Sequence, residues 1–194
     1  MLYKEKYIKY KKKYIRLKQN GGRCDYYVVI IGSFNQKSKK IIISDPSHIY
    51  IPEEHKKNSK LMKLNLVTKN VKQGKWQVIL KIKKEDKEKN AEIICIHKDS
   101  FSNESIEEVL SNDKWKKIGI IGVDICQAGI YDLKYYKYNE KIWQEINYEL
   151  IPEPTDYALS LKYGAVSISE NGIYPVYIMK DDSEVVAVKI VFIE

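Results

Sequence analysis

Short apolar runs rich in β-branched and aromatic residues recur along most of this chain, and they constrain its fold more than any other feature. Each run is long enough for one β-strand, and charged residues or glycine separate most neighbouring runs. We therefore predict an α+β fold with a mostly antiparallel β body, either sandwich-like or a strongly curved sheet, and one or two short helices. The runs occupy residues 25–34, 39–44, 76–84, 91–98, 115–125, 163–169, 173–179 and 184–193.

The last three runs give the clearest local prediction. Glu170-Asn171-Gly172 and Lys180-Asp181-Asp182-Ser183 are strong turn signals between them, which predicts a C-terminal β-meander. Pro175 lies inside the middle run and cannot donate a ladder hydrogen bond, so it marks an edge, a bulge or the start of a strand. The nearly unbroken apolar run at the end predicts a central strand.

One short helix has a recognisable start signal. Residues 102–113 read SNESIEEVLSND, in which Ser102 or Asn103 can cap a helix. Ser105 and Glu108 have the spacing of a capping box.

Three further segments connect these elements. The charged residues 83–90 predict the turn of a hairpin, and the polar residues 52–70 predict a long connection. Residues 139–150 favour a helix over a strand because their apolar positions alternate poorly.

The net charge of +8 is confined to one end of the chain. Residues 1–23 contain nine lysines or arginines and one glutamate, out of totals of 34 basic and 26 acidic residues. The remaining chain therefore has 25 residues of each sign and no net charge. Because a balanced surface does not attract phosphates over long distances, we expect any affinity for nucleic acid to lie at the N-terminus.

The first 22 residues, MLYKEKYIKYKKKYIRLKQNGG, predict a basic helical leader that ends at Gly21-Gly22 and precedes a single β-rich domain at 23–194. An isolated helix of this length is marginal in water, so we expect it to dock on a protein partner through its tyrosines and through Lys11, Lys12 and Lys13. Packing on the rest of the chain is one alternative, and RNA or DNA binding with bases stacked on tyrosine is another. The tyrosines follow the a/d period of a helix: Tyr3, Tyr7, Tyr10 and Tyr14.

Polar residues that could carry chemistry lie at the ends of the predicted strands. In Ser44-Asp45-Pro46-Ser47-His48 the Asp-Pro pair favours a turn, in which the aspartate accepts local backbone hydrogen bonds. A pocket at the strand ends, serving a small ligand or a hydrolase-type reaction, is the alternative. Cys126 and His48 would form a thiol–base pair if the fold brings them together, although a structural cysteine is the commoner case. The candidates for such a pocket are Asp45, His48, Asp124, Cys126, Gln127, Asp132 and Tyr174.

Several classes of protein are disfavoured by the sequence. Cys24, Cys95 and Cys126 are odd in number and widely spaced, which argues against a disulfide framework or a zinc knuckle. No group of ligands has a recognised metal-binding spacing, and the nucleotide-binding P-loop, GxGxxG and GxSxG signatures are absent. No apolar run is long enough for a membrane span, and no apolar region follows the basic start as in a secretory signal. We predict an intracellular protein without a cofactor; a dimer is compatible with the sequence.

The leader sequence YKEKYIKYKKKYIRLKQNGG at residues 3–22 resembles a leader shared by many otherwise unrelated proteins of giant viruses in the mimivirus group. In that pattern, Y-x-x-K-Y-L-K-Y-K-x-K-Y-L-x-L-K precedes Gly-Gly. The resemblance implies a common address, in the viral factory in the host cytoplasm or in the virion, and it raises cleavage near Gly22 as an option.

The body resembles an uncharacterised domain family of bacteria and large viruses that carries S-D-P, V-D-S-G-Q-A-G-x-x-D and G-D-G-x-Y-P-V-Y motifs. The corresponding residues here are 44–46, 123–132 and 170–177. Two departures weaken any inherited chemistry, because Ile125-Cys126 replaces Ser-Gly and Glu170-Asn171-Gly172 replaces Gly-Asp-Gly. The resemblance implies no known activity, so a non-enzymatic interaction or accessory protein addressed by its leader is the leading hypothesis.

Overall fold

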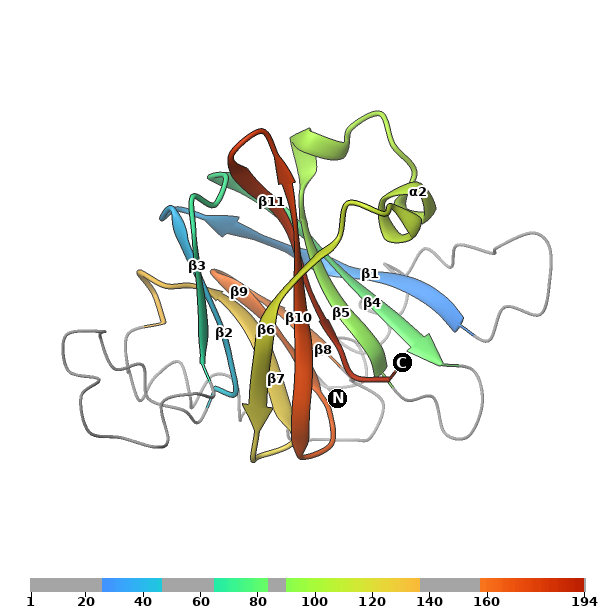
Figure 1. Ribbon diagram of the computed structural model, residues 1–194, viewed down its shortest axis with the longest axis vertical. Helices are drawn as coiled ribbons and strands as arrows, with labels where there is room; N and C mark the ends of the chain where they lie inside the picture. Colours follow the sequence, from blue (N-terminus) through green and yellow to red (C-terminus); the bar gives the residue numbers. More distant parts are fainter. Residues whose placement is uncertain (1–25, 47–64, 84–89, 137–157, 194) are drawn as a thin grey trace, which may run out of the picture.

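Eleven antiparallel strands in two sheets make up most of the part of the chain that the computed structural model describes, residues 26–46, 65–83, 90–136 and 158–193 (Figure 1). The larger sheet has six strands in the order β1-β4-β5-β11-β10-β6, and the smaller has five in the order β3-β2-β7-β9-β8. The larger sheet comprises β1 (Tyr26–Gln36), β4 (Gly74–Lys83), β5 (Asn90–His97), β6 (Lys116–Val123), β10 (Gly172–Asp181) and β11 (Glu184–Val191). The smaller comprises β2 (Lys40–Ser44), β3 (Leu66–Lys69), β7 (Gln127–Asp132), β8 (Ala158–Leu161) and β9 (Gly164–Ile168).

The main hydrophobic core lies between the two sheets. Isoleucines and valines of both sheets meet there, among them Ile41 and Ile130 of the smaller sheet and Val188 of the larger. Trp76 is fully buried, and its indole N–H donates to the carbonyl oxygen of Lys72 at 2.9 Å. The fold is therefore mostly antiparallel β, as the sequence predicts, with two sheets packed face to face.

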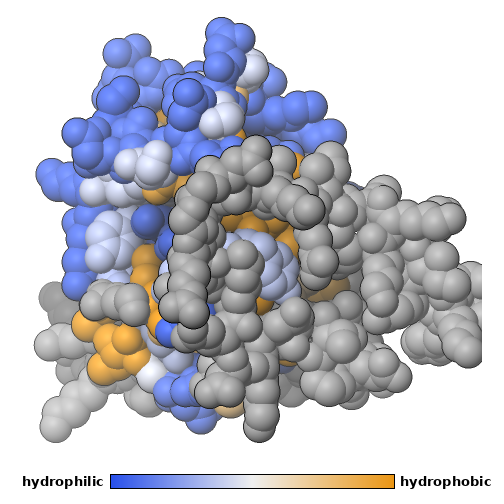
Figure 2. Space-filling view, turned by 90° about the vertical axis from the view of Figure 1, so that its right-hand side faces the viewer, coloured by the Kyte–Doolittle hydropathy of each residue, from blue (hydrophilic) through white to orange (hydrophobic). Residues whose placement is uncertain are grey.

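A short helical segment covers part of the outer face of the larger sheet. It consists of the 3₁₀ turn η3 (Lys98–Phe101) and the helix α2 (Ile106–Ser111), and it buries Val109 against a second, smaller core. Figure 2 looks at this side of the molecule, whose upper part is mainly hydrophilic. The predicted capping box is confirmed, but Ser105 is the N-cap in place of Ser102 or Asn103.

The chain crosses between the sheets several times, which the sequence does not predict. Residues 37–39 lead from β1 to β2, and residues 124–126 lead from β6 to β7. Residues 169–171 lead from β9 in the smaller sheet to β10 in the larger, so the predicted C-terminal meander is wrong. Of the three strands predicted to form the meander, β10 and β11 pair with each other as a hairpin, while β9 pairs with β7 and β8.

A bulge in β1 lets the two sheets approach each other closely. The register of β1 with β4 shifts between Ile30 and Gly32. A Cβ atom on Gly32 would lie only 2.6 Å from the Cβ atom of Ser160 in β8, so a larger residue does not fit.

Other element predictions can be compared directly. The hairpin of β4 with β5 and the central position of β11 are confirmed. On one side of β10, Pro175 lies opposite Ile120 of β6. On the other side, pairing with β11 begins only at Val176, so the proline lies where the strand has no partner, as predicted. Strands β3, β7 and β8 were not predicted. The leader helix and the helix at 139–150 lie outside the described residues.

Candidate functional site

Asp45 follows β2, and the residue is fully buried (0% exposed). Its Oδ2 accepts the backbone N–H groups of Asp124 at 2.8 Å and Ile125 at 3.0 Å, in the connection from β6 to β7. The hydroxyl of Tyr136 donates to the Asp45 carbonyl oxygen at 3.0 Å. The carboxylate thus holds a connection between the two sheets, since a buried charge is stabilised by backbone donors.

Cys126 lies in the same connection and is exposed. Its φ of 60° is in the left-handed region, which glycine tolerates best, so the glycine of the resembled motif would fit here without strain. Asn171 Oδ1 accepts the Cys126 N–H at 2.9 Å and lies 3.2 Å from the thiol sulfur. The thiol therefore has an amide oxygen beside it, which is not a base.

Tyr174 and Gln127 lie close to this connection. The Tyr174 hydroxyl donates to the Glu170 carbonyl oxygen at 2.6 Å, and burial raises the pKa of this tyrosine. Gln127 Oε1 is buried and lacks a hydrogen-bond partner within the described segments. One end of the sandwich thus gathers Asp45, Asp124, Cys126, Gln127 and Tyr174.

Asp132 lies at the opposite end of β7, five residues from Gln127 and therefore about 17 Å away. It is fully buried. One carboxylate oxygen accepts the N–H groups of Lys37 at 2.6 Å and Ser38 at 2.9 Å, and the other accepts the Ser38 hydroxyl at 2.5 Å and the Lys134 N–H at 2.9 Å. The structure therefore does not bring Asp132 into the predicted pocket, because it organises a second connection between the sheets.

The remaining candidates lie outside the described residues. His48 is one of them, so its predicted pairing with the Cys126 thiol stays a prediction. The leader positions Tyr3, Tyr7, Tyr10, Tyr14, Lys11, Lys12 and Lys13 also lie there.

The histidine that the structure does place, His97, is a core residue. Its Nδ1 lies 3.1 Å from Ser100 Oγ and its Nε2 lies 3.1 Å from the Gln73 carbonyl oxygen. Because a carbonyl can only accept, Nε2 carries the proton and Nδ1 accepts from the serine. Burial lowers the pKa of His97. No group of three or more His, Cys, Asp or Glu side chains within the described ranges could hold a metal ion.

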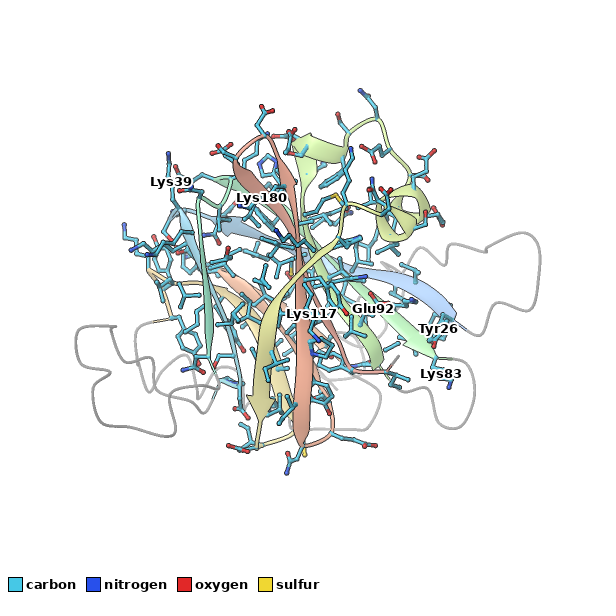
Figure 3. The ribbon with its side chains drawn as sticks, viewed as in Figure 1. Tyr26, Lys39, Lys83, Glu92, Lys117 and Lys180 are labelled. Carbon is cyan, nitrogen blue, oxygen red and sulfur yellow. The ribbon has the colours of Figure 1, made fainter. Side chains whose placement is uncertain are left out.

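A partly buried ion-pair network lies on the outer face of the larger sheet. Glu92 on β5 accepts from Lys81 on β4 at 2.6 Å and lies 3.4 Å from Lys189 on β11. The Lys189 ammonium also lies 4.7 Å from the Trp115 ring and 5.4 Å from the Tyr177 ring. Figure 3 labels Glu92 in the middle of this sheet. The glutamate is paired with both lysines within the fold, so we assign the network to stability.

A third group of polar residues remains, and we call it the tyrosine–lysine cluster: Lys37, Lys134, Tyr135, Lys162 and Tyr163. The two tyrosine rings are stacked with centroids 3.7 Å apart and planes 7° from parallel. The ammonium groups of Lys37 and Lys162 lie 5.6 and 5.3 Å from the Tyr163 centroid, and that of Lys134 lies 5.8 Å from the Tyr135 centroid. The lysines are exposed and the tyrosines half-buried.

Sequence reasoning missed this cluster because the charge of the body was counted as one sum. A usable signal is present, since Lys134-Tyr135 and Lys162-Tyr163 repeat the same dipeptide within two residues of a strand end. Lys37 joins them from the connection of β1 to β2. Figure 3 labels Lys39 of the same connection, on the opposite side of the molecule from Tyr26 and Lys83.

Comparison of the chain with known protein families, with curated proteins and with solved structures gives no match. Within the described ranges, no helix combines the length and apolar character needed to cross a bilayer.

Proposed function

We propose that this protein is a non-enzymatic interaction protein, a β body addressed to its partner by the basic leader. The observation that supports this most is the state of Asp45 and Asp132, two of the sequence candidates for chemistry. Both are fully buried and hydrogen-bonded to backbone amides of connections between the sheets. A general acid or base must reach its substrate, and neither carboxylate is placed to do so.

Exposed apolar side chains on the body support an interaction role. Ile120 is 47% exposed on the edge strand β6, and Ile173 is 67% exposed on the neighbouring β10. Ile125, which follows β6, is 37% exposed. Apolar groups gathered at a sheet edge are typical of surfaces that contact another protein.

The sequence of the leader supports its role in binding the partner. It carries the whole net charge of the chain and a stripe of tyrosines at helical spacing. Because the leader resembles those of giant-virus proteins, we propose that it directs the protein to the viral factory in the host cytoplasm or to the virion. The leader is then a helix joined to the β body, which gives the α+β class that the sequence predicts.

The test is the location of the full chain in infected cells. Replacing Tyr3, Tyr7, Tyr10 and Tyr14 by serine removes the aromatic stripe and should disperse a fluorescently tagged protein. Replacing the same four residues by phenylalanine is the matched control and should preserve its location. A serine variant that is located like the wild-type chain would overturn the role of the leader.

A further inference from the structure

We propose that the tyrosine–lysine cluster binds single-stranded nucleic acid. This inference goes beyond the proposed function, because the cluster belongs to the folded body and its binding does not depend on the leader.

The cluster is held in place by the fold. Asp132 Oδ2 binds the amides of Lys37 and Ser38, and Oδ1 binds the amide of Lys134. The Asp132 N–H donates to the Tyr163 carbonyl oxygen at 3.0 Å, and its carbonyl oxygen accepts the Tyr135 N–H at 3.0 Å. One buried residue thus fixes the three segments that present the cluster, so a ligand meets an arrangement that is already formed.

Among the described residues, no carboxylate pairs with the lysines of the cluster, Lys37, Lys134 and Lys162. Asp132 accepts four hydrogen bonds and is fully buried, so it offers no free oxygen to the three ammonium groups. The Glu92 network contrasts with this, since its glutamate holds both of its lysines. Three unpaired ammonium groups favour a polyanion.

The tyrosine pair narrows the choice of polyanion. Isolated aromatic pairs prefer offset or edge-to-face arrangements, whereas these rings are nearly parallel and 3.7 Å apart. This spacing is close to that of stacked bases, so a base can extend the stack. Lysine side chains are flexible and can turn from the rings toward phosphates. A duplex hides its base faces and an acidic peptide has none, so a single strand fits best.

The experiment measures fluorescence anisotropy of labelled 15-nucleotide single-stranded RNA and DNA with the full-length protein, between 50 and 200 mM NaCl. Replacing Lys37, Lys134 and Lys162 by glutamine should weaken binding at least about tenfold. It should also reduce the steepness of the plot of log affinity against log salt concentration by about 2, because each of the three lost phosphate contacts contributes about 0.7. The matched control replaces Lys98, Lys114 and Lys116, which are exposed near α2, by glutamine and should change affinity less than about twofold.

A second pair of variants tests the stack. Tyr163→Leu should weaken binding about tenfold or more, because stacking of one base on an aromatic ring is lost, whereas Tyr163→Phe should bind like the wild type. Urea unfolding of each variant shows whether its fold is kept.

Four results would overturn the proposal. The first is equal weakening by the control triple, and the second is loss only when Lys11, Lys12 and Lys13 are replaced by glutamine. Equal binding of duplex and single strand is the third. The fourth is equal competition by poly-glutamate at the same charge, which would indicate an acidic protein partner. None of these results bears on the location test of the leader, so the two proposals can fail separately.

Discussion

A buried carboxylate needs donors for its charge, and Asp45 and Asp132 find them in backbone amides of connections between the sheets. Each carboxylate satisfies N–H groups that lie outside any strand ladder, and each fixes where the chain changes sheets. At the scale of single residues, the burial of Asp45 and Asp132 is therefore explained by folding.

Asp45→Asn tests this assignment. The substitution removes the charge and turns one acceptor into an N–H₂ donor beside the amides of Asp124 and Ile125. We expect a loss of about 1–3 kcal/mol in the free energy of unfolding, because bonds to a charged acceptor are lost and buried donors are left unsatisfied. Urea denaturation measures it. The exposed Asp113→Asn is the control and should change stability by less than about 0.5 kcal/mol; an equal effect of the two substitutions would contradict the assignment.

Cys126 permits a test of its left-handed backbone. Cys126→Gly should leave the free energy of unfolding unchanged or raise it by up to about 1 kcal/mol, because glycine adopts a φ of 60° without strain. Cys126→Val should lower it by about 1–2 kcal/mol, since a β-branched side chain is disfavoured there. The shift of the urea midpoint orders the three proteins. Valine as stable as glycine would mean that the connection relaxes to another conformation.

The Asp-Pro pair predicts a turn in which Asp45 accepts local backbone hydrogen bonds. The carboxylate does accept backbone hydrogen bonds in the structure, but those given by Asp124 and Ile125 are not local. Their donors lie 79 and 80 residues away along the chain. A local pattern carries no information about such a distant segment, because only the packing of the sheets brings it near.

At the scale of elements, α2 shows how local and tertiary terms combine. A helix of six residues is too short to be stable alone, so it depends on its cap and on the contact of Val109 with the sheet. Ser105 Oγ accepts the Glu108 N–H at 3.2 Å, and Glu108 Oε2 accepts the Ser105 N–H at 2.6 Å. These bonds lower the pKa of Glu108.

Ser105→Ala tests the capping box. It should lower the free energy of unfolding by about 1 kcal/mol, because an N-terminal amide of α2 loses its acceptor. Hydrogen exchange should quicken first at the amides of α2, if the helix opens before the sheets do. Ser102→Ala removes a neighbouring exposed serine and should have little effect. Exchange at α2 that is unchanged in Ser105→Ala would show that packing alone holds the helix.

Elements with long apolar runs could be predicted from the sequence, and the others could not. Strands β4, β5 and β11 are buried on half or more of their residues and stand out as β-branched runs. Strands β3 and β8 have four residues each, too few for an alternation to be recognised. The turn at residues 170–172 has the sequence of a hairpin, yet it passes between sheets, because turn residues specify a change of direction and not the partner of the next strand.

At the scale of the whole molecule, a zero sum of charges hides a local excess of lysine. Residues 33–40, 69–75, 133–136 and 158–163 contain eight lysines and no aspartate or glutamate. The segment around η3 and α2 is mixed, because Glu104, Glu107 and Asp113 lie there with Lys98, Lys114 and Lys116. The arrangement of the strands creates the basic surface, so the count along the sequence could not reveal it.

The stability of the whole molecule should depend on pH through His97. Burial lowers the pKa of this imidazole in the folded state, while in the unfolded chain the value is about 6.5. The unfolded state therefore binds the proton more readily, and stability is lost as pH falls below about 6.5 toward the folded pKa. The free energy of unfolding from urea titrations should be smaller at pH 5.5 than at pH 7.5.

The variant His97→Gln tests this assignment. It should be less stable than the wild type at pH 7.5, because the contacts with Ser100 and Gln73 change, and it should lose less stability on acidification. Equal losses in the two proteins would assign the pH dependence to other groups, since any residue that titrates in both of them contributes equally.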